Sequence, residues 1–376
     1  MTPGATTSQA AAAGVAADAG ARPRLTSVDA MRGLTVAAML IVNDAGDWDH
    51  VHPWLEHSAW NGCTFADYIF PFFLFLVGVS ITLTVDTQLA RGVSPPVIAR
   101  KIVLRGARIV LLGLVLAAVA WWTIRATQAY RPMGVLQRIG ICYTAAGLIA
   151  LFVPSARIQW VLIAVMLLGY WALLSAFGPL LPGANLADHI DSAILGKHAY
   201  IYDATSGQGR DPEGFLSTLP AIATVLLGMR AGHWLRSQRT RTLLCVGGAS
   251  MLLGALWAPL FPINKQLWTP SFVLWTGGAA MLTLAIAHKA FDTWHWPPIA
   301  RSLGINAITA YAAAWIGTCL LEGTGAIRPL YHSVFVAAFG PPLAPWVPSL
   351  MFALAFTALF WLLIAWMTRR GWRITI

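Results

Sequence analysis

The sequence predicts an all-α polytopic membrane protein with about 10 transmembrane helices and both termini in the cytoplasm. Of its 376 residues, 57% are apolar and only 11% are charged, and the mean hydropathy is +0.65. Soluble domains carry about a quarter charged residues, so this chain cannot cover its surface with polar groups in water. Its apolar blocks have the length of bilayer-spanning helices, not the short alternating pattern of a membrane barrel.

Ten apolar blocks are the candidates for these helices, since a window of about 19 residues stays apolar through each. They lie near 28–46, 65–86, 103–123, 135–153, 158–178, 216–232, 242–260, 268–288, 300–321 and 345–367. The chain's basic residues gather mostly in the segments that are cytoplasmic when the N-terminus is inside, as the positive-inside rule expects.

The segment 1–24 is rich in Ala, Gly and Thr and lacks the apolar core of a signal peptide. We therefore expect a disordered cytoplasmic tail there and one transmembrane domain over 25–376. The net charge of +10 does not indicate nucleic acid, because the basic residues lie at block ends and form no stripe with aromatic residues. The four cysteines show no CxxC spacing, so neither a disulfide framework nor a zinc site is predicted.

The first helical hairpin carries the strongest candidate for chemistry. Asn43 and Asp67 should lie at the outer ends of the first two spans, with His57 in the loop between them. A histidine exchanges a proton near neutral pH and can act as a general base, and an asparagine amide can donate to a developing oxyanion. The alternative is that these are ordinary solvated or interfacial loop residues.

The same loop contains a weak metal-ligand pattern. His50 and His52, with Asp47 or Glu56, have donor atoms that zinc accepts. The spacing is not that of an established zinc motif, so no metal is expected.

Two further groups of polar residues meet apolar blocks. Gln137 and Arg138 open the fourth block, where such residues usually face the protein interior or a cavity. Arg138 is predicted either to hold a cofactor phosphate or to pair with Asp67 or Asp86. Glu213 precedes the sixth block and could contact a sugar hydroxyl or amine.

Asn264 and Lys265 lie just before the eighth block, at its outer end, and Trp268 begins it. For Lys265 the plain alternative is a side chain that anchors the helix at the membrane surface. Because several polar groups fall at outer helix ends, we expect a polar cavity that opens outward.

Several long motifs resemble the heparan-α-glucosaminide N-acetyltransferase family. They are RLTSVDAMRGLTVAAMLIVND, HSAWNGCTFADYIFPFFLFLVGVSI, GVLQRIGICY, DPEGFLSTLPAIATVLLG and NKQLWTPSFVLWTGG, and the resemblance extends over roughly 24–370. It implies an enzyme that takes acetyl-CoA from the cytoplasm and acetylates a glucosamine amine across the membrane. It also implies that His57, in the matching His-x-x-Trp-Asn-Gly segment, and Asn43 are the catalytic residues.

The functional prediction combines the motifs with this resemblance. The predicted catalytic residues are His57 and Asn43, acting with no metal. The residues predicted to bind the amino sugar are Asp47, Trp60, Asn61, Asp67, Glu213, Asn264, Lys265 and Trp268. The residues predicted to bind acetyl-CoA are Gln137, Arg138, Arg105 and Arg108.

Two rival functions stay open. A transporter for N-acetylglucosamine or a related sugar would also need a polar cavity with aromatic residues, but it would have no reason to bind CoA. A more distant acyltransferase would differ only in its acceptor, such as a cell-envelope polysaccharide. In each case the expected location is the cell inner membrane, in contact with lipid, and the oligomeric state is open, with a homodimer among the candidates.

Overall fold

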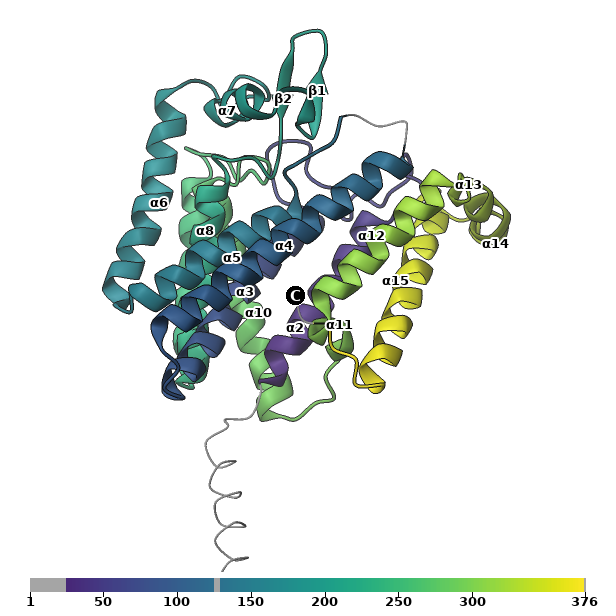
Figure 1. Ribbon diagram of the computed structural model, residues 1–376. Coiled ribbons are helices and arrows are strands. Elements are labelled where there is room, and N and C mark those ends of the chain that lie inside the picture. Colours follow the sequence, from purple (N-terminus) through teal and green to yellow (C-terminus); the bar gives the residue numbers. More distant parts are fainter. Residues whose placement is uncertain (1–24, 125–128, 375–376) are drawn as a thin grey trace, which may run out of the picture.

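The computed structural model describes residues 25–124 and 129–374, and it is a bundle of long helices (Figure 1). The long helices are α2 (Thr26–Asn43), α3 (Phe65–Ala90), α4 (Pro95–Thr123), α5 (Val135–Phe152), α6 (Ala156–Ala176), α8 (Thr218–Arg236), α9 (Thr240–Trp257), α10 (Pro270–Ala287), α12 (Ala307–Gly323) and α15 (Trp346–Arg369). Each coincides with one of the predicted apolar blocks. The predicted tail, 1–24, lies outside the described residues.

Shorter elements complete the fold. They are α7 (Leu186–Leu195), η1 (Gly196–His198), the strands β1 (Ile201–Asp203) and β2 (Gln208–Arg210), η2 (His288–Thr293), α11 (Arg301–Ile305), α13 (Ile327–Leu330), η3 (Tyr331–Val336) and α14 (Ala337–Phe339). The strands pair antiparallel, so the all-α prediction missed a small hairpin. Asp203 closes its turn by accepting hydrogen bonds from the Thr205 amide and the Ser206 hydroxyl.

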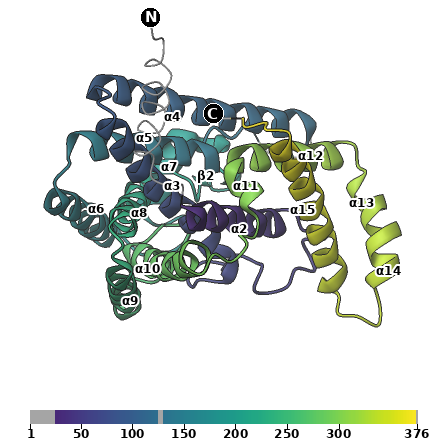
Figure 2. The same ribbon diagram turned by 90° about the horizontal axis from the view of Figure 1, so that it is seen from below.

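Seven helices within the described residues are long and apolar enough to cross a membrane. They are α3, α4, α5, α6, α9, α10 with η2, and α15. Helices α2, α8 and α12 fall short of that length or composition. Helix α2 lies in the middle of the bundle, in contact with α3, α10, α11, α12 and α15 (Figure 2). Neighbouring helices therefore cover much of its surface, which is why α2 can carry Asp29 and Arg32.

Helices α3 and α8 pack closely because glycines let their backbones approach. A Cβ atom on Gly78 would lie 2.0 Å from the Val225 carbonyl oxygen, and one on Gly228 would lie 2.0 Å from the Phe75 carbonyl oxygen. Both glycines thus face the backbone of the other helix, and this contact fixes α3, which carries Asp67.

We expect the Gly228→Ala substitution to lower the free energy of unfolding by about 3 kcal/mol, because its methyl group can be accommodated only if the two helix backbones move apart. Thermal unfolding of the detergent-solubilised protein measures the effect. Gly248→Ala in α9 is the matched control, since no atom lies within 4 Å of its added Cβ. Equal melting temperatures for the two variants would contradict this packing model.

Three long connections meet at one end of the bundle, which we call the loop end. They are 44–64, 177–217 and 258–269, and α7 with the β1–β2 hairpin lies there (Figure 1). The Gly62 amide donates to the Ile263 carbonyl, and the Trp60 indole donates to the Leu180 carbonyl. The sequence-distant loops thus form one structure.

Candidate active site

Helix α3 begins with a capping box that also holds His57. The Asp67 carboxylate accepts hydrogen bonds from the backbone amides of Ser58 and Thr64 at 3.1 and 3.0 Å. Its other oxygen lies 2.9 Å from His57 Nδ1. The Asp67 side chain has no exposed surface, whereas that of His57 is 47% exposed. A carboxylate in this position keeps the proton on Nδ1 and leaves the Nε2 lone pair available as a base.

Lys265 reaches this His57–Asp67 pair from the connection between α9 and α10. Its Nζ atom lies 3.0 Å from each ring nitrogen of His57 and 3.6 Å from an Asp67 oxygen. Burial lowers the pKa of Lys265, although the negative charges of Asp67 and Glu213 oppose this. A partly desolvated amine therefore lies directly against the histidine.

The neighbouring polar residues hold the loops together. Asn264 is buried and donates from its amide nitrogen to the Asn61 side-chain oxygen at 3.2 Å, while its own oxygen accepts from the Leu267 amide. Trp60 packs with the apolar cluster around Tyr170. These three predicted sugar-binding residues thus lie beside His57, and each already has a partner within the protein.

Within the described residues, no hydrogen bond or ion pair joins Asn43 or Asp47 to the His57–Asp67–Lys265 cluster. Asn43 is the last residue of α2 and is half-buried, and no hydrogen bond within the described residues joins it to His57. Asp47 contacts α15, where its backbone amide and carbonyl both bond to the Ser349 hydroxyl. The structure therefore brings Asp67, but neither Asn43 nor Asp47, into direct contact with His57.

The proposed metal ligands are also separated. His50 Nδ1 lies 2.9 Å from Asp47, whereas His52 packs edge-on against Trp346 at 4.7 Å between ring centres. Among the residues described, no group of three or more His, Cys, Asp or Glu side chains is arranged to hold a metal ion.

Arg138 and Trp268 are buried below these loops. The Arg138 guanidinium lies 5.2 Å from the centre of the Trp268 ring, and it donates to the Gly214 carbonyl and the Ser217 hydroxyl. The Trp268 indole donates to the Thr224 hydroxyl. The alternative pairing of Arg138 with Asp67 or Asp86 is wrong, because Asp86 bonds to Arg236 on α8 at 2.9 Å and Asp67 bonds to His57.

Glu213 belongs to an ion cluster with Arg131 and Asp211. The Arg131 guanidinium bonds to both carboxylates, reaching Asp211 through Nε at 2.8 Å, and its charge lies 4.4 Å from the Tyr200 ring centre. Burial alone would raise the pKa of Glu213, but the charges of Arg131 and Arg138 outweigh it and hold that pKa below its ordinary value. Arg131 could not be identified as the partner from the sequence, because it precedes Asp211 by 80 residues.

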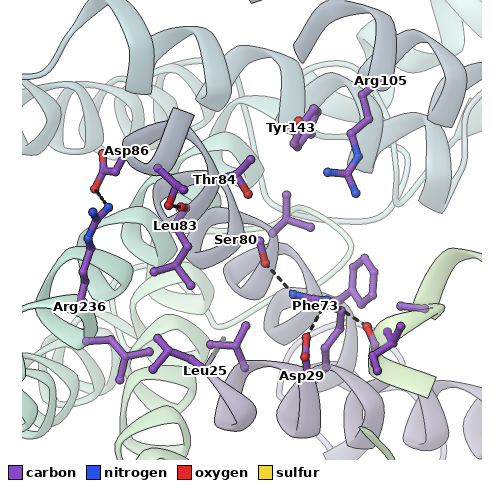
Figure 3. Close-up of a pocket in the computed structure, with 18 of the residues that line it drawn as sticks. Leu25, Asp29, Phe73, Ser80, Leu83, Thr84, Asp86, Arg105, Tyr143 and Arg236 are labelled. Carbon is purple, nitrogen blue, oxygen red and sulfur yellow. Dashed lines mark hydrogen bonds and ion pairs between the residues drawn. The ribbon is translucent and has the colours of Figure 1, made fainter. Parts of the chain in front are cut away.

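A cavity of about 1530 Å³ lies at the opposite end of the bundle, which we call the cavity end. The start of α2, the end of α3 and the end of α8 line it, together with parts of α4, α5, α11 and α12. Arg105 and Tyr143 point into it from α4 and α5, and Asp86 and Arg236 lie on the other side (Figure 3). Arg32 also lines it and donates to the Ser80 hydroxyl at 2.8 Å.

The cavity is only partly made of the predicted cofactor residues. Arg105 lines it, whereas Gln137, Arg138 and Arg108 do not. Gln137 is buried against Gly113, and Arg108 is exposed on α4. Arg32 lies within the first apolar block, and a charge within such a block is itself a sign of a functional site.

Helix α3 links the cavity to the loop-end cluster. Phe73 lines the cavity and follows Asp67 by six residues, which corresponds to about 9 Å along a helix. An elongated molecule with its charged part in the cavity would therefore need to extend only a short way between helices to reach His57.

The described helices form a bundle of the kind found in polytopic membrane proteins, with a carboxylate-bound histidine at one end and an arginine-lined cavity at the other. Comparison with known proteins then assigns the family. The chain belongs to the heparan-alpha-glucosaminide N-acetyltransferase family, whose catalytic-region model matches residues 24–258. The family predicted from the motifs is thereby confirmed.

Two curated relatives agree with this assignment. The chain is 28% identical over 359 residues to the heparan-alpha-glucosaminide N-acetyltransferase of Homo sapiens, covering 77% of this chain and 52% of the relative. It is 29% identical over 358 residues to the enzyme of the same name from Mus musculus, covering 77% and 53%. The chain thus spans about half the length of the curated relatives it matches.

Proposed function

We propose that this protein is a transmembrane N-acetyltransferase that moves an acetyl group from cytoplasmic acetyl-CoA to the amine of a glucosamine-type sugar on the other side. The observation that carries the proposal is the pairing of two sites at opposite ends of α3: the His57–Asp67 pair at the loop end and the arginine-lined cavity at the cavity end. A purely cytoplasmic reaction would need no such separation. Membership of an N-acetyltransferase family supplies the reaction type.

The cavity end is the proposed place of acetyl-CoA. CoA carries several phosphate charges, and arginine is the side chain best suited to bind phosphate. Arg32, Arg91, Arg105 and Arg236 all line the cavity. With the nucleotide part held there, the long pantetheine arm would run beside Phe73 and bring the thioester to His57.

At the loop end, His57 is the proposed general base. Its Nε2 takes a proton from the acceptor amine as the amine attacks the thioester carbonyl, and Asp67 stabilises the imidazolium that forms. Asn43 is proposed to stabilise the oxyanion, which requires the thioester carbonyl to lie between the end of α2 and His57. Direct transfer needs one chemical step, whereas an acetyl-histidine intermediate would need two.

The loop-end residues Asp47, Trp60, Asn61, Glu213, Asn264, Lys265 and Trp268 stay the proposed surroundings of the acceptor sugar. We place the protein in the cell inner membrane with ten spans and both termini in the cytoplasm. Helices α2 and α8 then cross the bilayer inside a cover formed by their neighbours, which suits the charges that they carry, and α12 is the tenth span.

Binding of acetyl-CoA to the detergent-purified protein tests this function first. We expect saturable binding by calorimetry and an approximately tenfold weaker affinity for Arg105→Gln, because a lost charged hydrogen bond costs about 1.5 kcal/mol or more. Arg241→Gln is the matched control, since Arg241 is exposed at the start of α9 and does not line the cavity. A folded wild-type protein that binds no CoA would favour the sugar-transport alternative.

A further inference from the structure

The Lys265 amine occupies a distinctive position in the loop-end cluster. His57 Nδ1 faces Asp67, so Nε2 is the nitrogen that would act as the base, and Lys265 Nζ lies over the imidazole ring at 3.0 Å from each of its nitrogens. The Lys265 side chain is only 14% exposed. Its amine therefore lies where an acceptor amine must come before it can lose a proton to His57.

We propose that Lys265 stands in the place of the acceptor amine and is itself acetylated by the enzyme when no sugar is bound. The proposal rests on the proposed function, because the acyl thioester is the second reactant. Under this proposal Lys265 is a site of covalent modification, and its amine competes with the amine of the acceptor sugar. An incoming amino sugar must displace the Lys265 amine from His57 to react.

The chemistry of this step balances without a further reactant. The Lys265 ammonium first loses one proton to solvent, and the neutral amine attacks the thioester carbonyl. His57 Nε2 takes the second proton from the nitrogen as the carbon–nitrogen bond forms. The carbon–sulfur bond then breaks, and the thiolate of CoA leaves and takes up that proton from His57. The lowered pKa of Lys265 eases the first of these transfers.

The product would be an inactive enzyme. An amide at Lys265 carries no charge and cannot be deprotonated again near neutral pH, so it would stay against His57. It would also remove the cation that lies 3.6 Å from the buried Asp67 carboxylate. Acceptor sugar should therefore protect the enzyme from its own acyl donor.

The other lysines of the chain are internal controls for such a reaction. The chain has four lysines, Lys101, Lys197, Lys265 and Lys289, and the other three are exposed. None of those three has a hydrogen bond to a histidine in the structure. Uncatalysed acetylation by a thioester favours accessible amines, so it would modify these three before Lys265.

The test is peptide mass spectrometry of the full-length protein incubated with acetyl-CoA over a time course. We expect Lys265 to gain an acetyl group about a hundredfold faster than any exposed lysine, which is the usual contribution of a general base. His57→Gln should lower the rate at Lys265 to that of the exposed lysines or below, with their own rates unchanged. Saturating glucosamine should suppress acetylation at Lys265 alone.

Acetylation of glucosamine by the same sample separates the two proposals. If glucosamine is acetylated while Lys265 reacts no faster than the exposed lysines, the acceptor-place proposal is overturned and the enzyme function stands. If Lys265 reacts fast but equally in His57→Gln, the contact with His57 is irrelevant and the proposal also fails. If neither glucosamine nor Lys265 is acetylated and CoA does not bind, the proposed function itself fails.

Discussion

Replacing His57 with alanine is expected to lower the rate of acetyl transfer to glucosamine by about 10²–10⁴-fold, the range attributable to a general base. Binding of acetyl-CoA should be almost unchanged, since His57 lies at the loop end and does not line the cavity. The variant should therefore lose the chemical step at the loop end and keep donor binding at the cavity end. Steady-state transfer and calorimetric CoA binding on the same preparation measure both.

His50→Ala is the matched control for that experiment. His50 lies in the same loop, but its ring pairs with Asp47 and makes no contact with Asp67 or Lys265. We expect His50→Ala to retain most of the transfer activity. If His57→Ala turned over at the wild-type rate, the base would have to be another group, and the role assigned to the His57–Asp67 pair would be wrong.

Asp67→Asn tests the same pair from the other side. An asparagine keeps the size of the side chain but cannot stabilise the imidazolium. It would also weaken the cap of α3, because Asp67 accepts the Thr64 amide hydrogen bond. Measuring both the acetyl-transfer rate and the melting temperature distinguishes the lost stabilisation of the imidazolium from the weaker cap. Only the lost stabilisation of the imidazolium lowers the transfer rate of protein that is still folded.

The elements that the sequence predicted well are those defined by local patterns. A helix in lipid must satisfy its own backbone hydrogen bonds, so each apolar block became a long helix. The contact between His57 and Asp67 could also be predicted from the sequence, because the two residues lie ten positions apart, on either side of the start of a helix. Local sequence therefore predicts a helix or a contact when the residues that determine it lie close together in the chain.

The cavity could not be predicted in this way. Asp86 and Arg236 form one wall of it, yet they come from two helices far apart in the chain, whose close packing involves Gly78 and Gly228. Gln137 and Arg138 were predicted to bind the cofactor because polar residues that open an apolar block usually face the interior or a cavity, and Arg108 because basic residues on the inner face could attract phosphate. Gln137 and Arg138 fill the interior and do not line the cavity, and Arg108 faces outward.

The loop-end asparagines likewise have partners within the protein that the sequence did not predict. Asn61 and Asn264 each looked like a residue aimed at a ligand, and the structure joins them to each other. A polar side chain at a helix end has neighbouring loops as its nearest partners once the chain is folded, and buried polar groups are almost always bonded. Lys265 differs because its amine lies against the ring of the proposed base, His57.

The ion cluster at Arg131 gives the largest expected effect on stability. Asp211 is fully buried and Glu213 is 11% exposed at the side chain, and Arg131 bonds to both. Arg131 lies in the segment before α5, and its bonds to Asp211 and Glu213 join this segment to the one before α8. These bonds hold the long connection 177–217 over the loop end. Removing the Arg131 cation, which bonds to both, leaves two carboxylates without this partner in a poorly solvated place.

Replacing Arg131 with methionine should therefore lower the free energy of unfolding by about 3–5 kcal/mol near pH 7.5, the usual cost of breaking a buried ion pair from one side. The loss should shrink as the pH falls. In the wild type the pKa of Glu213 is held below its ordinary value, so its stabilising contribution is present above the unfolded pKa and is lost only as the pH falls through the folded one. In the variant both carboxylates lack the cation, their pKa values rise, and protonation relieves the penalty.

Thermal unfolding of both proteins in detergent from pH 5 to pH 8 measures this difference. Arg328→Met is the matched control, because it removes the same charge from an exposed position, and it should melt like the wild type at every pH. A gap between Arg131→Met and wild type that stayed constant with pH would mean that the lost stability comes from packing of the Arg131 side chain on Tyr200 and not from its charge. A gap that narrows toward pH 5 would assign it to the two carboxylates.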